Sequence, residues 1–354
     1  MKKIRIAQIG AAHDHAAMIM NSIRKLSDIF EVVGYCDPEE DEVEVDAETG
    51  QRYVAGYPVP EGRSELSYQN YEGVKKYTLE ELLAMDDLDA VTVETSETNL
   101  FKYAQPFAEK GIHVHMDKPG GLEYADFEKL VNTFKETGKV LHLGYMYRYN
   151  PEYLKLLEDI DAGKYGEIYS VECHMDCCHP LRKRDWLKKY KGGMMFFLGC
   201  HLVDIIYRIQ GEPLEVLPMN CATETCGSAA EDYGFAVFKY PHGVSFAKTC
   251  AAEPGGFLRR QLVICGTKGT VIFEPFEGYT KEVGSSSLMT TVRVVDEDLF
   301  NWGNNGKWYD SEPFDRYDPM MESFAQLVRG EKENPYTMDY ELKLYQLLLK
   351  ACGR

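Results

Sequence analysis

The feature that most constrains the fold is a regular alternation of apolar, strand-like segments with amphipathic, helix-like segments over the first 145 residues. Connections long enough to hold a helix cannot close a tight hairpin, so this alternation favours βαβ units and a parallel sheet. We predict strands at 3–9, 30–36, 90–94, 112–116 and 140–145, and helices at 16–26, 79–85, 101–110 and 127–136.

The pattern changes after residue 145. We predict a helix at 151–160, a strand at 168–177, a very apolar helix at 194–209, and successive strands at 233–240, 244–251, 261–265, 270–273 and 291–295. Strands in succession favour a large, open, mostly antiparallel sheet. We therefore predict an α/β chain with two domains, residues 1–145 and 146–354, of which the second is of α+β type.

Three further segments have recognisable boundaries. Asp318-Pro319 is typical of a helix start, with a stop at Gly330, and Asp339 is a candidate cap for a last helix, 339–352, that could pack back on the first domain. The stretch from Asp37 to Glu48 holds eight acidic and no basic residues, and a Gly/Pro-rich run follows at 56–62. We predict that this stretch is an inserted, solvated helix and loop.

Charge and composition exclude several partners. A formal net charge of -18 repels nucleic acid and anionic membranes, and no apolar run is long enough for a signal peptide or a membrane span. Ten cysteines, mostly in apolar runs, are typical of buried thiols in a reducing compartment, so we predict a cytoplasmic protein. The Cys173 to His179 cluster could suggest zinc, but neighbours on a strand point to opposite faces, so we predict no metal site.

The turn after the first strand is a candidate phosphate-binding loop. Of the pattern G-x-G-x-x-G it keeps Gly10, with the small Ala12 in second place and His15 in third. Asp37 ends the second strand, where a carboxylate could bind an adenosine ribose and, with the acidic run behind it, repel a 2′-phosphate; the alternative is a turn residue before Pro38. We predict NAD rather than NADP. His13 and His15 either face the nicotinamide or substrate, or pack at the helix start.

Two residues are candidates for hydride-transfer chemistry. Lys118 follows an apolar strand in the sequence Asp117-Lys118-Pro119, and His201 lies on the apolar helix at 194–209. Oxidising an alcohol requires a group that removes the hydroxyl proton, which either side chain could do. Asp204 shares a helix face with His201 and could orient it; alternatively, His201 is a core histidine and Asp204 its structural partner.

In its motifs and their order the chain resembles the glucose-fructose oxidoreductase, inositol dehydrogenase and MocA (Gfo/Idh/MocA) family of NAD(P)-dependent sugar dehydrogenases. The resemblance covers nearly the whole chain and rests on these segments: Gly10 and its helix, Asp37, Thr95-Ser96-Glu97, Asp117-Lys118-Pro119, Gly144 to Pro151, Gly163 to Ile168, Gly192-Gly193, His201, Asp204, and Gly266 to Thr270. It implies a Rossmann first domain, a Lys118 beside the nicotinamide and substrate hydroxyl, and a cis Lys118–Pro119 bond. Thr95, Ser96 and Asp117 would join the cofactor site.

The resemblance also implies a carbohydrate substrate and a homodimer or homotetramer. Many family members place an aspartate one turn before the histidine, whereas this chain has Phe197. Aromatic and basic side chains suited to a polyol are Tyr147, Arg148, Arg184 and Trp186, and we predict that they bind substrate together with Asp204.

We predict oxidation of a ring hydroxyl of a sugar, glycoside or cyclitol, by analogy giving a 3-keto product. The alternatives are a redox-neutral glycoside-cleaving enzyme with tightly bound NAD, and a non-catalytic sugar or NAD(P) sensor. For the oligomer contact we predict the open sheet face around Phe235, Val237, Phe238 and Phe246.

Overall fold

The computed structural model of the chain describes residues 2–11, 15–38, 44–50, 52–54, 57–59, 70–280 and 287–354. The chain forms two compact units. The first comprises residues 1–145 and 317–345, and the second comprises residues 146–316 and 346–354. Segment 317–345 thus belongs to the first unit although it follows the whole sheet of the second.

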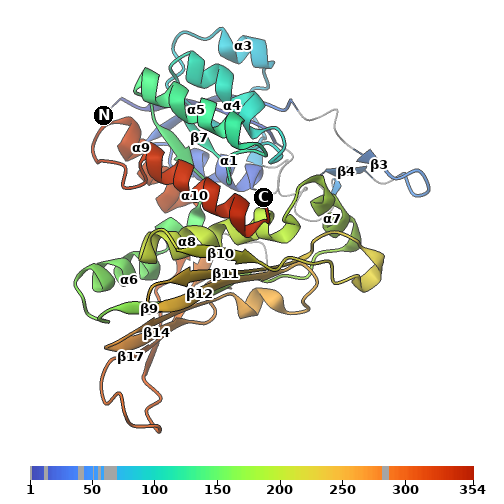
Figure 1. Cartoon of the computed structure of the whole chain (residues 1–354). Coiled ribbons are helices and arrows are strands. Elements are labelled where there is room, and N and C mark those ends of the chain that lie inside the picture. The colour runs from blue at the N-terminus through green and yellow to red at the C-terminus, as the bar shows by residue number, and fades with distance from the viewer. Residues whose placement is uncertain are drawn as a thin grey trace. The chain divides into compact units, whose positions relative to one another are not determined.

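The first unit contains a five-stranded parallel sheet in the order β2-β1-β6-β7-β8, which confirms the predicted Rossmann-like architecture. Its elements are β1 (Ile4–Ile9), α1 (Ala16–Lys25), β2 (Phe30–Cys36), α3 (Leu79–Leu83), β6 (Ala90–Val93), α4 (Leu100–Glu109), β7 (His113–Met116), α5 (Tyr124–Thr137), β8 (Leu141–Leu143) and α9 (Asp318–Val328). Helices α4 and α5 pack together on one side of the sheet, and α1 and α9 pack together on the other (Figure 1).

Local signals explain where several helices begin and end. At α3 the Glu81 amide donates to the Thr78 hydroxyl (3.1 Å), while Glu81 accepts from the Thr78 amide (2.8 Å), which satisfies two end groups of the helix at once. Helix α5 ends at Gly138, whose φ of +65° suits a residue without a side chain. The last helix, α10 (Met338–Ala351), begins before Asp339, so the predicted Asp339 cap is wrong: the Tyr340 amide donates to the Thr337 hydroxyl (3.1 Å).

A row of polar side chains crosses the first unit's sheet at one level. Tyr35, Gln8, Thr92, His115 and His142 are paired residues on successive strands. All but the half-exposed Tyr35 are buried, although parallel strands covered on both faces are normally apolar throughout. Parts of the row are hydrogen-bonded: the Gln8 amide donates to the carbonyls of residues 10 and 16, and the Nδ1 atoms of the two histidines lie 2.7 Å apart.

The acidic insertion differs from the helix and loop predicted for it. In its described part, β3 (Glu44–Val45), β4 (Arg52–Val54) and β5 (Tyr57–Val59) form a small antiparallel sheet. The Asp46 carboxylate accepts from the amides of Glu48 (3.0 Å) and Thr49 (2.8 Å), which builds a turn where the prediction had a helix. Local turn formation by Asp46 therefore outweighs the helix propensity of the surrounding glutamates.

The second unit contains an eight-stranded sheet in the order β10-β11-β12-β9-β13-β14-β17-β18, in which only the β12–β9 pair is parallel. Its elements are α6 (Pro151–Asp161), β9 (Ile168–His174), α7 (Leu181–Trp186), a π-helical turn (Met195–Gly199), α8 (Cys200–Gln210), β10 (Glu215–Pro218), β11 (Tyr233–Tyr240), β12 (Gly243–Cys250), β13 (Gln261–Gly266), β14 (Gly269–Phe273), β15 (Gly278–Tyr279), β16 (Ser287–Met289), β17 (Thr291–Val295), β18 (Lys307–Asp310) and β19 (Phe314–Asp315). The predicted large, mostly antiparallel sheet is confirmed.

Helices α6 and α8 lie on one side of this sheet (Figure 1). On the other side, Phe235 and Phe246 are half-buried and stack on each other with ring centroids 5.5 Å apart. Phe238 was predicted on that open face, but it is 1% exposed and points to the helix-covered side because neighbours on a strand alternate. Within the described ranges, no helix combines the length and hydropathy that crossing a bilayer requires.

Candidate functional site

Gly10 begins the candidate cofactor edge of the first unit. It follows β1 with a φ of +93°, and a Cβ atom there would collide with the carbonyl group of Glu94. Only glycine meets both conditions, so the backbone stays bare where a phosphate could approach the start of α1. Ala12 and His13, the other residues predicted in this loop, lie outside the described residues.

Asp37 lies directly beyond β2, at the same edge of the parallel sheet as Gly10. Its Oδ1 accepts a hydrogen bond from the Ala11 amide at 3.3 Å, so the carboxylate is tied to the loop after β1. A carboxylate at the end of the second strand is where a Rossmann fold binds ribose hydroxyls. The geometry therefore agrees with the predicted role of Asp37.

Lys118 lies beyond β7 and is fully buried, with 0% of its surface exposed. Its Nζ is 3.9 Å from Glu97 Oε1 and 4.0 Å from Asp117 Oδ2, and the Lys118–Pro119 peptide is cis, as the resemblance implies. Gly120 follows with a φ of +131°, and a Cβ there would strike the Phe127 ring. The lysine is thus held in a tight turn with carboxylates beside its ammonium group.

Thr95 and Ser96 precede Glu97 after β6, so these two predicted cofactor residues lie at the same edge as Asp117. Thr95 is buried, and Ser96 Oγ lies 2.9 Å from the Thr98 hydroxyl. Both hydroxyls therefore belong to the ordered loop that also carries Glu97.

Sequence reasoning missed a third buried carboxylate at this edge, that of Glu94, beside those of Glu97 and Asp117. Its Oε1 lies 3.5 Å from His115 Nε2, and His115 in turn meets His142. Burial holds the pKa of His115 at about 4, partly opposed by Asp117, so His115 is neutral. The signal in the sequence was an acidic residue closing the otherwise uncharged strand Ala90–Val93.

His15, Glu94 and Asp117 each place a possible metal-ligating atom within 4.8 Å of the others, which distinguishes them among the described residues. His15 Nδ1 is 3.5 Å from Asp117 Oδ1. One imidazole and two carboxylates could hold a divalent cation, and their negative charge also suits the cationic ring of an oxidised nicotinamide. The Cys173 to His179 segment, for which zinc was rejected, forms the end of β9 and the chain beyond it.

In the second unit, His201 is the second residue of α8, directly after the π-helical turn Met195–Gly199. It is 1% exposed, and its ring lies 5.5 Å from the ring of Tyr147 at a tilt of 58°. Such π turns are rare and frequently occur at functional sites. Phe197, in the place of the family aspartate, is part of this turn and is also buried.

Asp204 and Arg148 form a buried pair, with both side chains 2% exposed. Arg148 donates from Nε to Asp204 Oδ2 at 2.9 Å and from Nη2 to Oδ1 at 2.8 Å. Both carboxylate oxygens of Asp204 thus accept from Arg148. This bidentate geometry is the strong form of an arginine–carboxylate contact. That Asp204 orients His201 or is its structural partner, and that Arg148 binds substrate, stay predictions.

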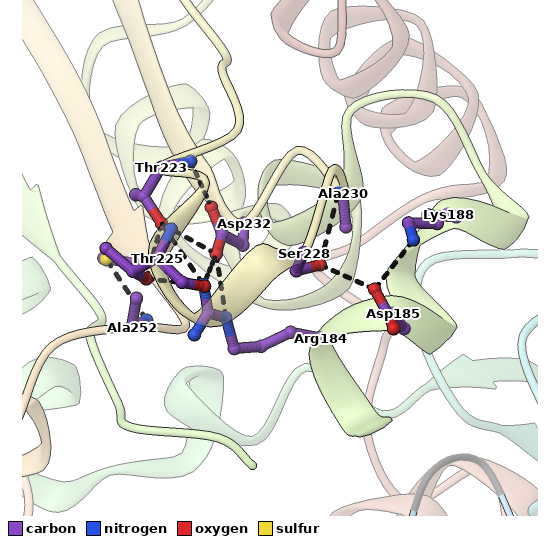
Figure 2. Close-up of polar contacts among 10 residues, drawn as sticks. Arg184, Asp185, Lys188, Thr223, Thr225, Ser228, Ala230, Asp232 and Ala252 are labelled. Atoms are coloured by element: carbon purple, nitrogen blue, oxygen red, sulfur yellow. Dashed lines mark hydrogen bonds and ion pairs between the residues drawn. The ribbon is translucent and has the colours of Figure 1, made fainter. Parts of the chain in front are cut away.

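Arg184 holds α7 against the loop before β11 (Figure 2). Its Nε donates to Asp232 Oδ2 at 2.8 Å, and its Nη2 donates to the Thr225 carbonyl (2.8 Å) and hydroxyl (2.6 Å). Asp232 also accepts from the Thr223 amide at 2.7 Å, as Figure 2 shows. The bonds of Arg184 build a structural clamp, and its role in binding substrate stays a prediction.

Trp186, also predicted to bind substrate, is buried at the end of α7. The ammonium of Lys183, itself 0% exposed, lies 4.0 Å from the Trp186 ring and 4.5 Å from the Phe197 ring. The Trp186 and Phe197 rings meet edge to face at 5.8 Å. A cation over two aromatic faces gains electrostatic attraction that partly offsets its burial.

Models of one protein family match both halves of the chain. A model for an oxidoreductase family with an NAD-binding Rossmann fold (GFO/IDH/MocA) matches residues 4–145, and a model for the GFO/IDH/MocA C-terminal domain matches residues 153–272. The uncharacterised oxidoreductase YdgJ of Escherichia coli is 25% identical over 287 residues, which is 74% of this chain and 77% of YdgJ. Myo-inositol 2-dehydrogenase of Thermotoga maritima is 23% identical over 259 residues, 71% of this chain and 72% of that enzyme.

Solved structures share the fold across the full chain. The 3-ketoreductase KijD10 of Actinomadura kijaniata, solved with NADP and TDP-benzene, superposes with a TM-score of 0.75 at 16% identity and covers 98% of this chain and 96% of its own. An identity this low shows a common fold alone.

Proposed function

This chain belongs to the GFO/IDH/MocA family of oxidoreductases, whose N-terminal domain binds NAD(P), and we propose that it transfers a hydride between a ring hydroxyl of a sugar, glycoside or cyclitol and the nicotinamide. The observation that carries this proposal is the fully buried Lys118 directly beyond β7, at the sheet edge that also holds Gly10 and Asp37. Ligands of open α/β sheets bind outside the carboxyl ends of the strands.

The residues at this edge fit a dinucleotide. The absence of a side chain at Gly10 lets the turn after β1 lie directly against the Glu94 carbonyl at the end of β6, and Asp37 is held at the end of β2 by the Ala11 amide. When bound, NAD supplies the hydride acceptor of the reaction. We propose that Gly10, Asp37, Thr95, Ser96 and Asp117 hold it, and that Asp37 favours NAD over NADP because a carboxylate repels a 2′-phosphate.

Lys118 is the first candidate for contact with the reacting hydroxyl. As an ammonium it can donate a hydrogen bond to the oxygen as negative charge develops there, and as an amine it can accept the hydroxyl proton. Glu97 and Asp117, near 4 Å from its Nζ, restrict its position. His201, with its ring buried beside Tyr147, is the second candidate for the base, and variants of the two residues distinguish between them.

The direct test is absorbance at 340 nm of purified protein with NAD⁺ or NADP⁺ and a panel of hexoses, glycosides and inositols. Lys118→Ala should lower kcat at least about a hundredfold and leave NAD binding largely intact, because it removes a proton-transfer group. Lys135→Ala is the matched control, since Lys135 is exposed and pairs with the exposed Asp339. His201→Asn, compared over pH, shows whether the loss of activity at acidic pH belongs to the histidine, because a general base must be unprotonated to accept the hydroxyl proton.

Each outcome has a distinct meaning. A Lys118→Ala variant with unchanged turnover removes Lys118 from the mechanism. If no sugar gives NADH but denaturation releases NAD, the dehydrogenase hypothesis is rejected in favour of the redox-neutral enzyme or the sensor.

We further propose that the protein is a homodimer or homotetramer that buries the open face of the eight-stranded sheet. The half-buried stack of Phe235 and Phe246 on that face supports this proposal. Light scattering on wild type and Phe246→Ser tests it: the variant should have a lower mass, and a wild-type monomer would refute it.

A further inference from the structure

A buried cluster in the second unit carries more positive than negative charge. The Glu277 cluster consists of Tyr147, Arg260, Glu277 and Arg316. Tyr147 donates to Glu277 Oε1 at 2.9 Å, and Arg260 pairs with the same oxygen. Arg316 donates from Nε to Oε2 at 3.0 Å, and its Nη2 forms an ion pair with the same oxygen at 2.7 Å. Two guanidiniums therefore share one carboxylate.

Glu277 is ionised despite its burial. Burial by itself raises the pKa of Glu277, but Arg316 and Arg260 outweigh it and hold the pKa below its usual range. Among the four side chains of the cluster, two guanidinium groups meet one carboxylate, so these four together carry a net positive charge. An excess charge of this kind is costly in a protein interior unless an anion meets it.

Arg260 also carries a buried N–H donor, at Nε, that meets no acceptor among the described residues. The residue as a whole is 7% exposed. Its guanidinium lies 4.3 Å over the Phe257 ring, which stacks on Tyr279 with centroids 4.7 Å apart. A buried N–H without an acceptor is the kind of group that a ligand oxygen satisfies.

The Glu277 cluster is one side chain away from His201. Tyr147 hydrogen-bonds Glu277 with its hydroxyl and faces the His201 ring with its own ring, at 5.5 Å. A second buried cation, Lys183, contacts Phe197, which lies one turn before His201. The Glu277 cluster and Lys183 therefore each lie one aromatic side chain away from the segment that carries His201, in a chain whose net charge is -18.

We propose that the substrate is an anionic sugar or cyclitol, whose carboxylate or phosphate group binds Arg260 in the Glu277 cluster. This proposal rests on the dehydrogenase function proposed above and names its substrate class. Arg260 supplies charge-assisted hydrogen bonds to the anionic group, and Tyr147 sets the spacing between that group and His201.

The test compares matched neutral and anionic substrates with the full-length protein and NAD⁺. The pairs are glucose with glucuronate, galactose with galacturonate, and glucose with glucose 6-phosphate, which separates carboxylate from phosphate recognition. Wild type should favour at least one anionic member by about tenfold or more in kcat/KM. Arg260→Gln should remove that preference mainly by raising KM for the anion, and Arg260→Lys should restore part of it.

Arg259→Gln is the matched control. Arg259 is the next residue along the chain, but it is 56% exposed and pairs with Glu253, so its loss should leave the preference unchanged. If Arg260→Gln does not fold, wild type and Arg260→Lys still decide the question.

Failure of this proposal is distinct from failure of the proposed function. Oxidation of neutral sugars with no preference for their anionic partners, or an equal loss for both in Arg260→Gln, overturns the anion site and leaves the dehydrogenase intact. If no sugar is oxidised, titration calorimetry with glucuronate and glucose 6-phosphate decides: binding that Arg260→Gln abolishes supports the site, and no heat with either anion overturns it.

Discussion

Removing Asp204 should reveal whether this carboxylate stabilises the fold or serves His201. Asp204→Ala leaves the Arg148 guanidinium, 2% exposed, without the two hydrogen bonds of 2.9 and 2.8 Å that it donates to the carboxylate. Breaking a buried ion pair by deleting one partner costs about 3–5 kcal/mol. In a unit of this size each kcal/mol lowers Tm by about 2–4 °C, so a decrease of about 6–20 °C is expected.

The double variant Arg148→Met with Asp204→Leu separates the two roles. Replacing both partners with apolar side chains of similar size leaves no unpaired charge, and such replacements are often neutral or stabilising. If Asp204 is structural, the double variant recovers Tm and retains kcat. If Asp204 orients His201, Tm recovers while kcat stays low.

The assay combines thermal melting by circular dichroism with NADH formation at saturating substrate. Arg208→Ala is the control on the same helix, because its contact with Asp161 is long (3.8 Å) and solvent-exposed, and its loss should cost at most about 1 kcal/mol. A Tm for Asp204→Ala within about 2 °C of wild type would refute a stabilising role of the Arg148–Asp204 pair, because breaking a buried pair of this geometry should lower Tm by more than that.

Three further variants test the first unit. Asp37→Ser should raise the NADP-to-NAD ratio of kcat/KM by about tenfold or more, since it removes the carboxylate at the end of β2; a constant ratio in steady-state kinetics would exclude Asp37 from cofactor selection. Gly10→Ala should weaken NAD binding in calorimetry and destabilise the fold by about 1–3 kcal/mol, because the added Cβ meets Glu94 at a φ of +93°; unaltered affinity would contradict the close approach. Burial keeps the pKa of His115 at about 4 against 6.5 in the unfolded chain, so the unfolded state takes up the proton first and His115 alone should remove about 3 kcal/mol of stability as pH falls from 6.5 to 4, in addition to a loss from His113, whose pKa burial also lowers to about 4. His115→Leu should flatten this dependence in urea titrations, and an unchanged slope would show that His115 does not cause it.

The sequence predicted what depends on local pattern and on recognisable motifs. The parallel sheet, the mostly antiparallel second sheet and the positions of Gly10, Asp37 and Lys118 at one sheet edge follow from periodicity and from strand ends, which are local properties. Helix α8 and its π-helical turn were predicted as one apolar helix, because periodicity does not register a single extra residue in a turn.

Partners distant in the chain were beyond such reasoning. Arg184 and Arg148 are residue types that often bind sugars. In the structure they donate hydrogen bonds to Asp232 and Asp204, which lie 48 and 56 positions away in the chain. The Glu277 cluster joins residues more than 100 positions apart, and no motif marks it. Pairing of this kind depends on tertiary packing, which only the folded structure supplies.

The polar row through Tyr35, Gln8, Thr92, His115 and His142 also protects the first unit against misalignment during folding. In a parallel sheet with two apolar faces, a strand shifted by one residue still buries apolar side chains, and one shifted by two residues restores the original orientation as well, so neither error is strongly penalised. The row opposes such shifts, because a shift of β1 would break the hydrogen bonds of the Gln8 amide, and a shift of β7 or β8 would separate the paired imidazoles of His115 and His142. The polar row thus favours the native register of the strands that carry the cofactor edge.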